Sequence, residues 1–193
     1  MTDPIPLAGK TINNRRLIGN FVVLVLLVVT GWQIYLAFPP NKITIIEGKK
    51  FVGSRFEISM PKGWVIGDSE RLYVEALFVE PARKDGQPFL VNVNVVSEAT
   101  DDNIERYVNR NVALLKNKLK SYKLFGSKVM TLAGIKAVLI EGTFEQNGYT
   151  LQNKQMLLES NNRAYIVTGT ALQGDWEAYN PVITQVLQSF KLK

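Results

Sequence analysis

The stretch IKAVLIEGTFEQNGYTLQNKQMLLESNNRAYIVTGTAL, residues 135–172, decides the fold of this chain. It holds three segments whose composition and alternation predict strands at 135–144, 149–159 and 163–172. Asn147-Gly148 and Asn161-Asn162 separate these segments, and such pairs favour the tight turns of β-hairpins because they tolerate positive φ angles. The stretch therefore predicts an antiparallel meander of three strands.

Two helices are predicted, one before the meander and one after it. Apolar residues at helical spacing predict the first at 102–120, where Asp102 and Glu105 form a pattern typical of a helix start. Asn180-Pro181 predicts the start of the second, because proline favours the first helical position. Both helices have one apolar face, so each is expected to pack on the sheet.

Further strands are predicted outside the meander. The Val-Asn alternation of residues 89–96 predicts a strand with one buried face. The other predicted strands are 43–46, 56–60, 72–80 and 129–132. This order predicts an α+β domain, in which helices pack on an antiparallel sheet.

An uncharged apolar segment lies near the N-terminus. No charged residue occurs between Arg16 and Lys42, and residues 17–38 are mainly apolar. About 20 apolar residues in a helix cross a bilayer core of about 30 Å. The sequence therefore predicts a transmembrane anchor helix at 17–38.

The flanks of this segment predict its orientation. Arg15 and Arg16 precede it, so the positive-inside rule places residues 1–16 in the cytoplasm and the main domain on the far side, periplasmic, extracellular or thylakoid-lumenal. Asn20 and Gln33 are the polar residues expected near the interfaces or in hydrogen bonds to a partner helix. The expected membrane-interface anchors are Arg15, Arg16, Trp32, Tyr35 and Phe38.

A cleaved signal peptide is the alternative for this segment. Signal peptides have shorter apolar cores, of roughly 7–15 residues, and end in small residues. The far end here, WQIYLAFPP at 32–40, lacks such a site, so an uncleaved anchor is favoured. The predicted organisation is a tail at 1–16, the anchor at 17–38, a linker at 39–55 and one extracytoplasmic domain at 56–193.

The composition excludes several kinds of chemistry. The chain of 193 residues has no His and no Cys, which excludes Ser-His-Asp and Cys-His catalytic sites and the usual zinc or copper sites. Its net charge of +6 is too mild to predict a nucleic-acid partner. No phosphate-binding glycine motif occurs. No catalytic residue and no cofactor is predicted.

The densest carboxylates are Glu98, Asp101, Asp102 and Glu105. Carboxylate oxygens are the ligands that Ca²⁺ and similar hard cations prefer. Acidic residues at a helix start also complement the helix dipole and its free N–H groups, and this structural role is the favoured interpretation. These four residues are therefore metal ligands only in the less favoured alternative.

The densest basic residues are Lys116, Lys118, Lys120 and Lys123, here called the lysine patch. Lysines at the C-terminal end of a helix complement its dipole, which is the simpler interpretation. The functional interpretation is contact with anionic lipid or with an acidic partner. Trp64 and Trp176 lie beside predicted turns and are expected to cover the edge of the core.

One segment and three later features resemble a known family. The segment Phe56-x-Ile58-x-x-Pro61-x-Gly63-Trp64 resembles the opening of the PsbP/DcrB-like (Mog1/PsbP fold) proteins. The later features are the helix after the Val-rich strand, the strand from 134 to 143 before a hairpin, and the ending YIVTGT at 165–170 followed by Ser189-Phe190. The resemblance spans about residues 43–193.

This resemblance implies an α/β/α sandwich around a central antiparallel sheet. It also implies a non-enzymatic, extracytoplasmic protein attached to a membrane or to a membrane complex. Photosynthetic members are lumenal subunits or assembly factors of photosystems, and other members are bacterial lipoproteins. The chain departs from these in its predicted transmembrane helix and in its lack of His.

The sequence thus predicts a membrane-anchored, non-catalytic accessory protein. Its expected partners are the lipid bilayer and a membrane protein complex that it docks on, assembles or stabilises. The first alternative is an extracytoplasmic carrier or sensor of a lipid or small ligand. The remote alternative is an enzyme that uses carboxylates, Ser or Lys.

Overall fold

The computed structural model describes residues 50–70, 72–81 and 89–193. A seven-stranded antiparallel sheet forms the centre, in the order β3-β4-β5-β9-β8-β7-β6. Its strands are β3 (Val65–Ile66), β4 (Ala76–Val79), β5 (Asn92–Ala99), β6 (Lys120–Leu132), β7 (Ile135–Gln146), β8 (Tyr149–Ser160) and β9 (Arg163–Leu172).

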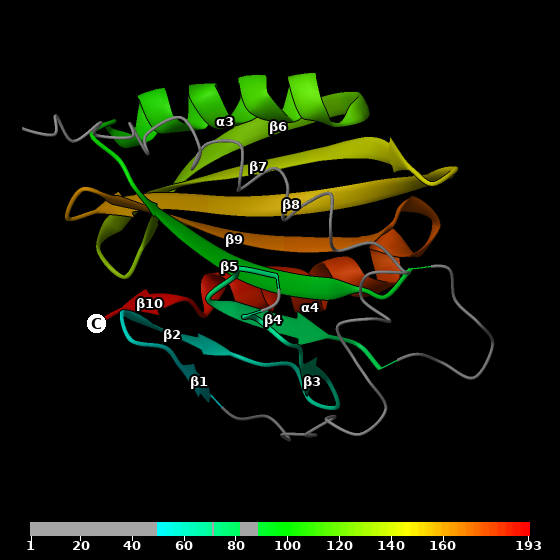
Figure 1. Ribbon diagram of the computed structural model, residues 1–193, viewed down its shortest axis with the longest axis horizontal. Coiled ribbons are helices and arrows are strands. Elements are labelled where there is room, and N and C mark those ends of the chain that lie inside the picture. Colours follow the sequence, from blue (N-terminus) through cyan, green and yellow to red (C-terminus); the bar gives the residue numbers. More distant parts are fainter. Residues whose placement is uncertain (1–49, 71, 82–88) are drawn as a thin grey trace, which may run out of the picture.

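A smaller antiparallel sheet lies beside the large one (Figure 1). Its order is β1-β2-β10, so its middle strand comes from the start of the described domain and one edge strand from the end. The strands are β1 (Lys50–Val52), β2 (Phe56–Ser59) and β10 (Lys191–Leu192). This pairing brings the two ends of the domain together.

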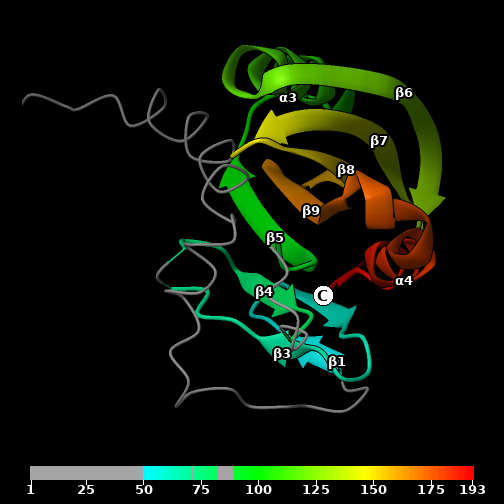
Figure 2. The same cartoon turned by 90° about the vertical axis from the view of Figure 1, so that its right-hand side faces the viewer.

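Two helices cover opposite faces of the large sheet (Figure 2). Helix α3 (Ile104–Lys118) packs on one face, and helix α4 (Trp176–Gln188), preceded by the short 3-10 helix η1 (Gln173–Asp175), packs on the other. The small sheet shares the α4 side, since Phe56 and Ile58 of β2 belong to the same core cluster as Ile183 of α4. The predicted antiparallel sheet with helices on both faces is therefore confirmed.

The predicted hairpins are confirmed as well. Asn147 and Gly148 have φ angles of 50° and 82°, and Asn161 and Asn162 have φ angles of 54° and 56°. Both central residues of each turn thus lie in the left-handed region, as the turn that matches the twist of paired strands requires. These two turns fix the register of β7, β8 and β9.

Several predicted boundaries are wrong. The side chain of Asn103, not Asp102, caps α3, because its oxygen accepts a hydrogen bond from the backbone N–H of Arg106 at 3.0 Å. The helix ends at Lys118, and β6 then begins at Lys120, nine residues before the strand that was predicted at 129–132. The strand predicted at 72–80 is β4, and the one predicted at 89–96 is β5.

The last helix also begins earlier than predicted. It starts at Trp176, so Pro181 lies inside α4 and not at its first position. Pro181 is the sixth residue of α4, beyond the first turn whose N–H groups have no intrahelical partner, so it removes one intrahelical hydrogen bond. Trp64 and Trp176 are both buried in the core of the α4 side, as predicted.

The strand predicted at 43–46 and the anchor predicted at 17–38 lie outside the described residues. In the part that is described, no helix has both the length and the apolar character needed to cross a bilayer. The anchor remains a prediction from the sequence.

Helix α4 approaches β9 most closely at Gly169. A Cβ atom added there would lie 2.3 Å from Cγ2 of Ile183, which is itself fully buried. Only a residue without a side chain allows this approach, and the contact sets the distance between helix and sheet.

We therefore expect Gly169→Ala to destabilise the full chain by about 1–3 kcal/mol through overpacking. Chemical denaturation followed by circular dichroism measures the change. Gly174→Ala is the matched control, because a Cβ there meets no atom within 4 Å. Equal unfolding free energies for the two variants would contradict the role of the Gly169 contact.

Candidate anion-binding site

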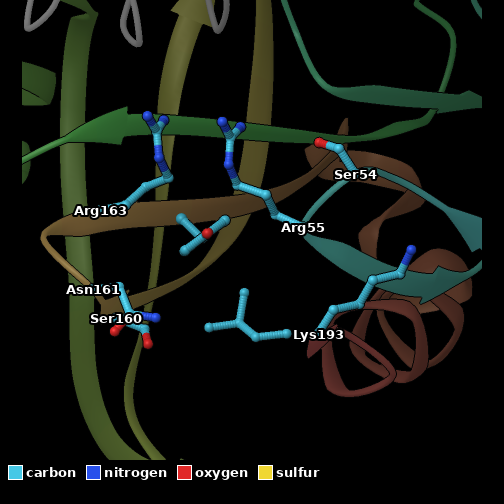
Figure 3. Close-up of a pocket in the computed structure, with 8 residues that line it drawn as sticks. Ser54, Arg55, Ser160, Asn161, Arg163 and Lys193 are labelled. Atoms are coloured by element: carbon cyan, nitrogen blue, oxygen red, sulfur yellow. The ribbon is translucent and has the colours of Figure 1, made fainter.

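A pocket of about 300 Å³ lies where the small sheet meets the turn between β8 and β9 (Figure 3). Its lining comes from segments far apart in the sequence: the β1–β2 turn, the β8–β9 turn and the C-terminal residues. The lining residues are Ser54, Arg55, Ser160, Asn161, Arg163, Tyr165, Leu192 and Lys193. Three of them are cations and none is acidic, so the pocket has a positive character.

Hydrogen bonds outside the pocket lining orient the side chain of Arg163. It is the first residue of β9 and follows directly on the tight turn of Asn161 and Asn162. Its guanidinium donates a hydrogen bond to Oγ of Ser97 at 2.9 Å, and that hydroxyl donates to the carboxylate of Glu75. The carboxylate therefore supports Arg163 through Ser97, and the remaining guanidinium N–H groups are left for the pocket.

The backbone of Arg55 is fixed by the small sheet. Its carbonyl accepts a hydrogen bond from the backbone N–H of Lys193 at 3.0 Å. The neighbouring Gly53 donates to the carbonyl of Phe56 at 2.9 Å, which closes the turn between β1 and β2. The side chain of Arg55 is exposed, and within the described residues it has no hydrogen-bond or ion-pair partner.

The guanidinium groups of the two arginines lie on the same side of the pocket. Figure 3 shows the side chains of Arg55 and Arg163 running in the same direction, with their guanidinium groups at the same end. The ammonium of Lys193 instead donates to the carbonyl of Gly53 at 2.8 Å. The arrangement can therefore bind an anion through two planar, permanently charged forks of N–H donors.

The lysine patch is divided between two elements, which corrects its predicted place at a helix end. Lys116 and Lys118 lie in the last turn of α3, whereas Lys120 and Lys123 lie on β6. All four are exposed. Lys120 forms an ion pair with Glu145 at 2.9 Å, and this contact raises the pKa of Lys120 and lowers the pKa of Glu145.

The carboxylates proposed as metal ligands face cations or a phenol instead. Glu98 is buried and accepts a hydrogen bond from the Tyr107 hydroxyl at 2.7 Å, and burial together with this carboxylate raises the pKa of Tyr107. Asp102 pairs with Arg110 at 2.7 Å. Glu105 pairs with Lys136, whose hydrogen bond lowers the pKa of that carboxyl. In the described ranges, no three acidic residues converge in a way that could hold a metal ion, Asp101 included.

The predicted membrane-interface and partner-helix residues lie outside the described part of the chain. They are Arg15, Arg16, Asn20, Trp32, Gln33, Tyr35 and Phe38.

A second polar cluster lies buried between α3 and the large sheet, where one face of β5 was predicted to be solvated. The buried Asn111 of α3 donates to the side chain of Gln155 at 2.9 Å, and Gln155 donates to Thr168 at 3.3 Å. The cluster continues across β5, β9 and β8 in two adjacent rows, Asn92–Thr170–Asn153 and Asn94–Thr168–Gln155. Both polar atoms of the Asn153 side chain have no partner among the described residues.

We expect Asn111→Ala to cost about 1–3 kcal/mol of unfolding free energy, because it leaves the buried Gln155 oxygen without its donor. Asn117→Ala is the matched control on the same helix, since Asn117 is exposed, and its effect should stay within about 0.5 kcal/mol. Denaturant titration of the full chain measures both. A control variant as unstable as Asn111→Ala would contradict the role of the buried bond, because alanine has a higher helix propensity than asparagine.

Sequence reasoning did not find the pocket arginines. Arg55 lies in the β1–β2 turn of the small sheet and Arg163 begins β9 of the large sheet, and the fold brings both to one pocket. No local signal in the sequence marks such a pair. The turn at Asn161-Asn162 did predict that a strand begins at Arg163, but it did not predict a binding role for that residue.

Solved structures of similar fold include proteins from Pseudomonas, Synechocystis and Mycobacterium. A protein of unknown function from Pseudomonas aeruginosa, PA94, described as a putative regulator, is 19% identical with a TM-score of 0.54, over 75% of this chain and 96% of that chain. The cyanobacterial PsbP (CyanoP) of Synechocystis is 12% identical with a TM-score of 0.59, over 80% of this chain and 98% of that one. LpqN, involved in cell envelope biogenesis of Mycobacterium tuberculosis, is 17% identical with a TM-score of 0.56, over 85% and 97%.

These identities are low, so the structures show a shared fold. No curated protein sequence matches the chain at a significant level. The family model described as DcrB matches residues 76–189, which run from β4 to the end of α4 and make up more than half of the chain. The resemblance predicted from the sequence is thereby confirmed, and the chain belongs to the DcrB family.

Proposed function

We propose that this chain is a membrane-anchored, non-catalytic accessory protein that docks on a membrane protein complex. The uncharged segment at 17–38 supplies the anchor, and the described domain is the docking module. The domain has the fold of CyanoP and of the envelope-biogenesis protein LpqN, which supports an accessory role in the cell envelope. The absence of His and Cys from the sequence favours binding over catalysis.

The observation that carries this proposal is the exposed lysine patch at the junction of α3 and β6. Within the described residues only Lys120 of these four lysines pairs with a carboxylate, that of Glu145. Lys116 and Lys118 therefore offer their charges to a partner, and so does Lys123, although its charge also helps to lower the pKa of Glu145. A cationic surface of this kind steers and orients an acidic surface on a neighbouring protein.

Anchoring would make a modest affinity sufficient. A domain tethered to the membrane meets its neighbours at a high effective concentration, set by the length of the linker. Few residues separate the predicted anchor from β1, which begins at Lys50 within the predicted linker, so the search is confined to a thin layer above the bilayer. The proposed main domain is accordingly extracytoplasmic.

Affinity purification of the tagged full chain from native membranes tests the proposal. We expect a defined complex to be retained, and we expect Lys116→Glu/Lys118→Glu/Lys123→Glu to lower its yield about tenfold or more, at about 1 kcal/mol per lysine. Raised salt should have the same effect on the unmodified chain, because screening weakens exposed charge contacts.

The matched control reverses three exposed cations elsewhere, Lys62→Glu/Arg106→Glu/Lys191→Glu. It changes the net charge equally but leaves the lysine patch intact, so the complex should survive. Recovery of only the free chain from the unmodified sample would overturn the docking role. Equal losses in both triple variants would overturn the assignment of docking to the lysine patch.

A further inference from the structure

We propose that the pocket between the small sheet and the β8–β9 turn binds a phosphate group. The phosphate belongs either to the headgroup of a phospholipid or to a soluble phosphoester. This site is separate from the lysine patch: it lies on the face of α4 and the small sheet, whereas the patch lies at the junction of α3 and β6. The inference therefore goes beyond docking.

The first step is the charge of the pocket. Seven of its eight lining residues carry a polar or charged side chain, and Leu192 is the apolar one. No acidic side chain lines the pocket, and Glu75 accepts a hydrogen bond from Ser97, which in turn accepts one from Arg163. Two guanidinium groups that share a pocket repel each other, and an anion between them removes that repulsion.

The second step is the number of donors. Each guanidinium has five N–H donors, and only one contact, that of Arg163 with Ser97, is made within the described residues. A single bidentate arginine already engages both oxygens of a carboxylate. A phosphate has enough oxygens to accept from Arg55 and Arg163 at once and from a hydroxyl besides. The hydroxyls of Ser54 and Ser160 line the same pocket.

The third step is preorganisation. Arg163 is oriented by Ser97, and the backbone of Arg55 is fixed by its hydrogen bond with Lys193. Side chains that are already oriented lose less conformational entropy when a ligand binds. The ring of Tyr165 is buried and packs against Phe190 with a centroid distance of 5.8 Å, so the apolar part of the lining is rigid.

The size of the pocket limits the ligand. A volume of about 300 Å³ is at the lower end of the range for small-molecule sites. It accommodates a phosphate with a few attached carbons, such as a glycerol unit, next to Leu192 and Tyr165. A large cofactor would not fit.

Calorimetric titration of the full chain in a neutral detergent tests the chemistry. We expect inorganic phosphate to bind saturably and acetate to bind at least about tenfold more weakly at equal ionic strength. Arg55→Gln should weaken phosphate binding about tenfold or more, since it removes one charge-assisted contact from an exposed position that does not support the fold. Arg55→Lys keeps the charge but not the planar fork of N–H donors. Its affinity for phosphate should lie between those of the unmodified chain and Arg55→Gln.

The matched control is Lys62→Gln/Lys191→Gln, which removes two exposed cations that do not line the pocket. It should bind phosphate as the unmodified chain does. Absence of saturable phosphate binding would overturn the proposal. Equal binding by Arg55→Gln, Arg55→Gln/Arg163→Gln and the control would also overturn it, because phosphate would then bind elsewhere.

Two soluble probes distinguish the sources of the phosphate. Glycerophosphoglycerol is the diester headgroup of phosphatidylglycerol, and glycerol 3-phosphate is a monoester. Diester binding at least as tight as that of the monoester, and lost in Arg55→Gln, assigns the pocket to a lipid headgroup. Monoester binding at least about tenfold tighter assigns it to a soluble phosphoester. Diester and monoester binding that both persist in Arg55→Gln would overturn the proposal.

Discussion

The close approach of α4 to β9 at Gly169 is the contact on which the rest of this structure depends. It lets the side chain of Ile183 pack directly on the central strand β9. The contact thereby fixes the position of α4 on the sheet. Phe190 follows at the end of the helix, where its ring stacks on that of Phe56 with a centroid distance of 5.2 Å. The next two residues form β10, which pairs with β2 and so sets the position of Arg55. The absence of a side chain at Gly169 thus helps to determine the position of Arg55 in the anion-binding pocket.

The two faces of the large sheet are built on different principles. The α4 face is held by aromatic and aliphatic contacts, and its ring cluster extends from Phe190 through Phe56 and Phe51 to Phe78. The α3 face contains the rows of buried amides and hydroxyls, in which Asn153 lacks a partner among the described residues. Burying such groups costs free energy that apolar packing does not cost. Both faces bury an apolar cluster, and the α3 face carries in addition a polar layer whose unmatched groups cost free energy.

Local signals in the sequence were sufficient for the meander but not for the site. Asn147-Gly148 and Asn161-Asn162 specify hairpin turns through their own φ angles, so the strands beside them could be predicted without knowledge of the rest. Helix α3 was found from its apolar spacing, but its end was not, because Lys120 and Lys123 suit a helix and a strand edge equally well. The alternation of Val and Asn predicted that Asn92 and Asn94 lie on a solvated face. They are in fact buried, because elements distant in the sequence pack over them. The pocket could not be predicted for the same reason, because its two arginines come from separate sheets that meet only in the folded domain.

The pocket is built from both sheets, so a ligand bound in it affects how the sheets are held together. Arg55 belongs to the turn that leads into β2 of the small sheet, whereas Arg163 begins β9 of the large sheet. An anion that contacts both guanidinium groups therefore links the two sheets, and it binds only when they are docked. A ligand that binds the native arrangement and not an opened one stabilises that arrangement by mass action. An anion in the proposed site therefore stabilises the packing of β1, β2 and β10 against the large sheet.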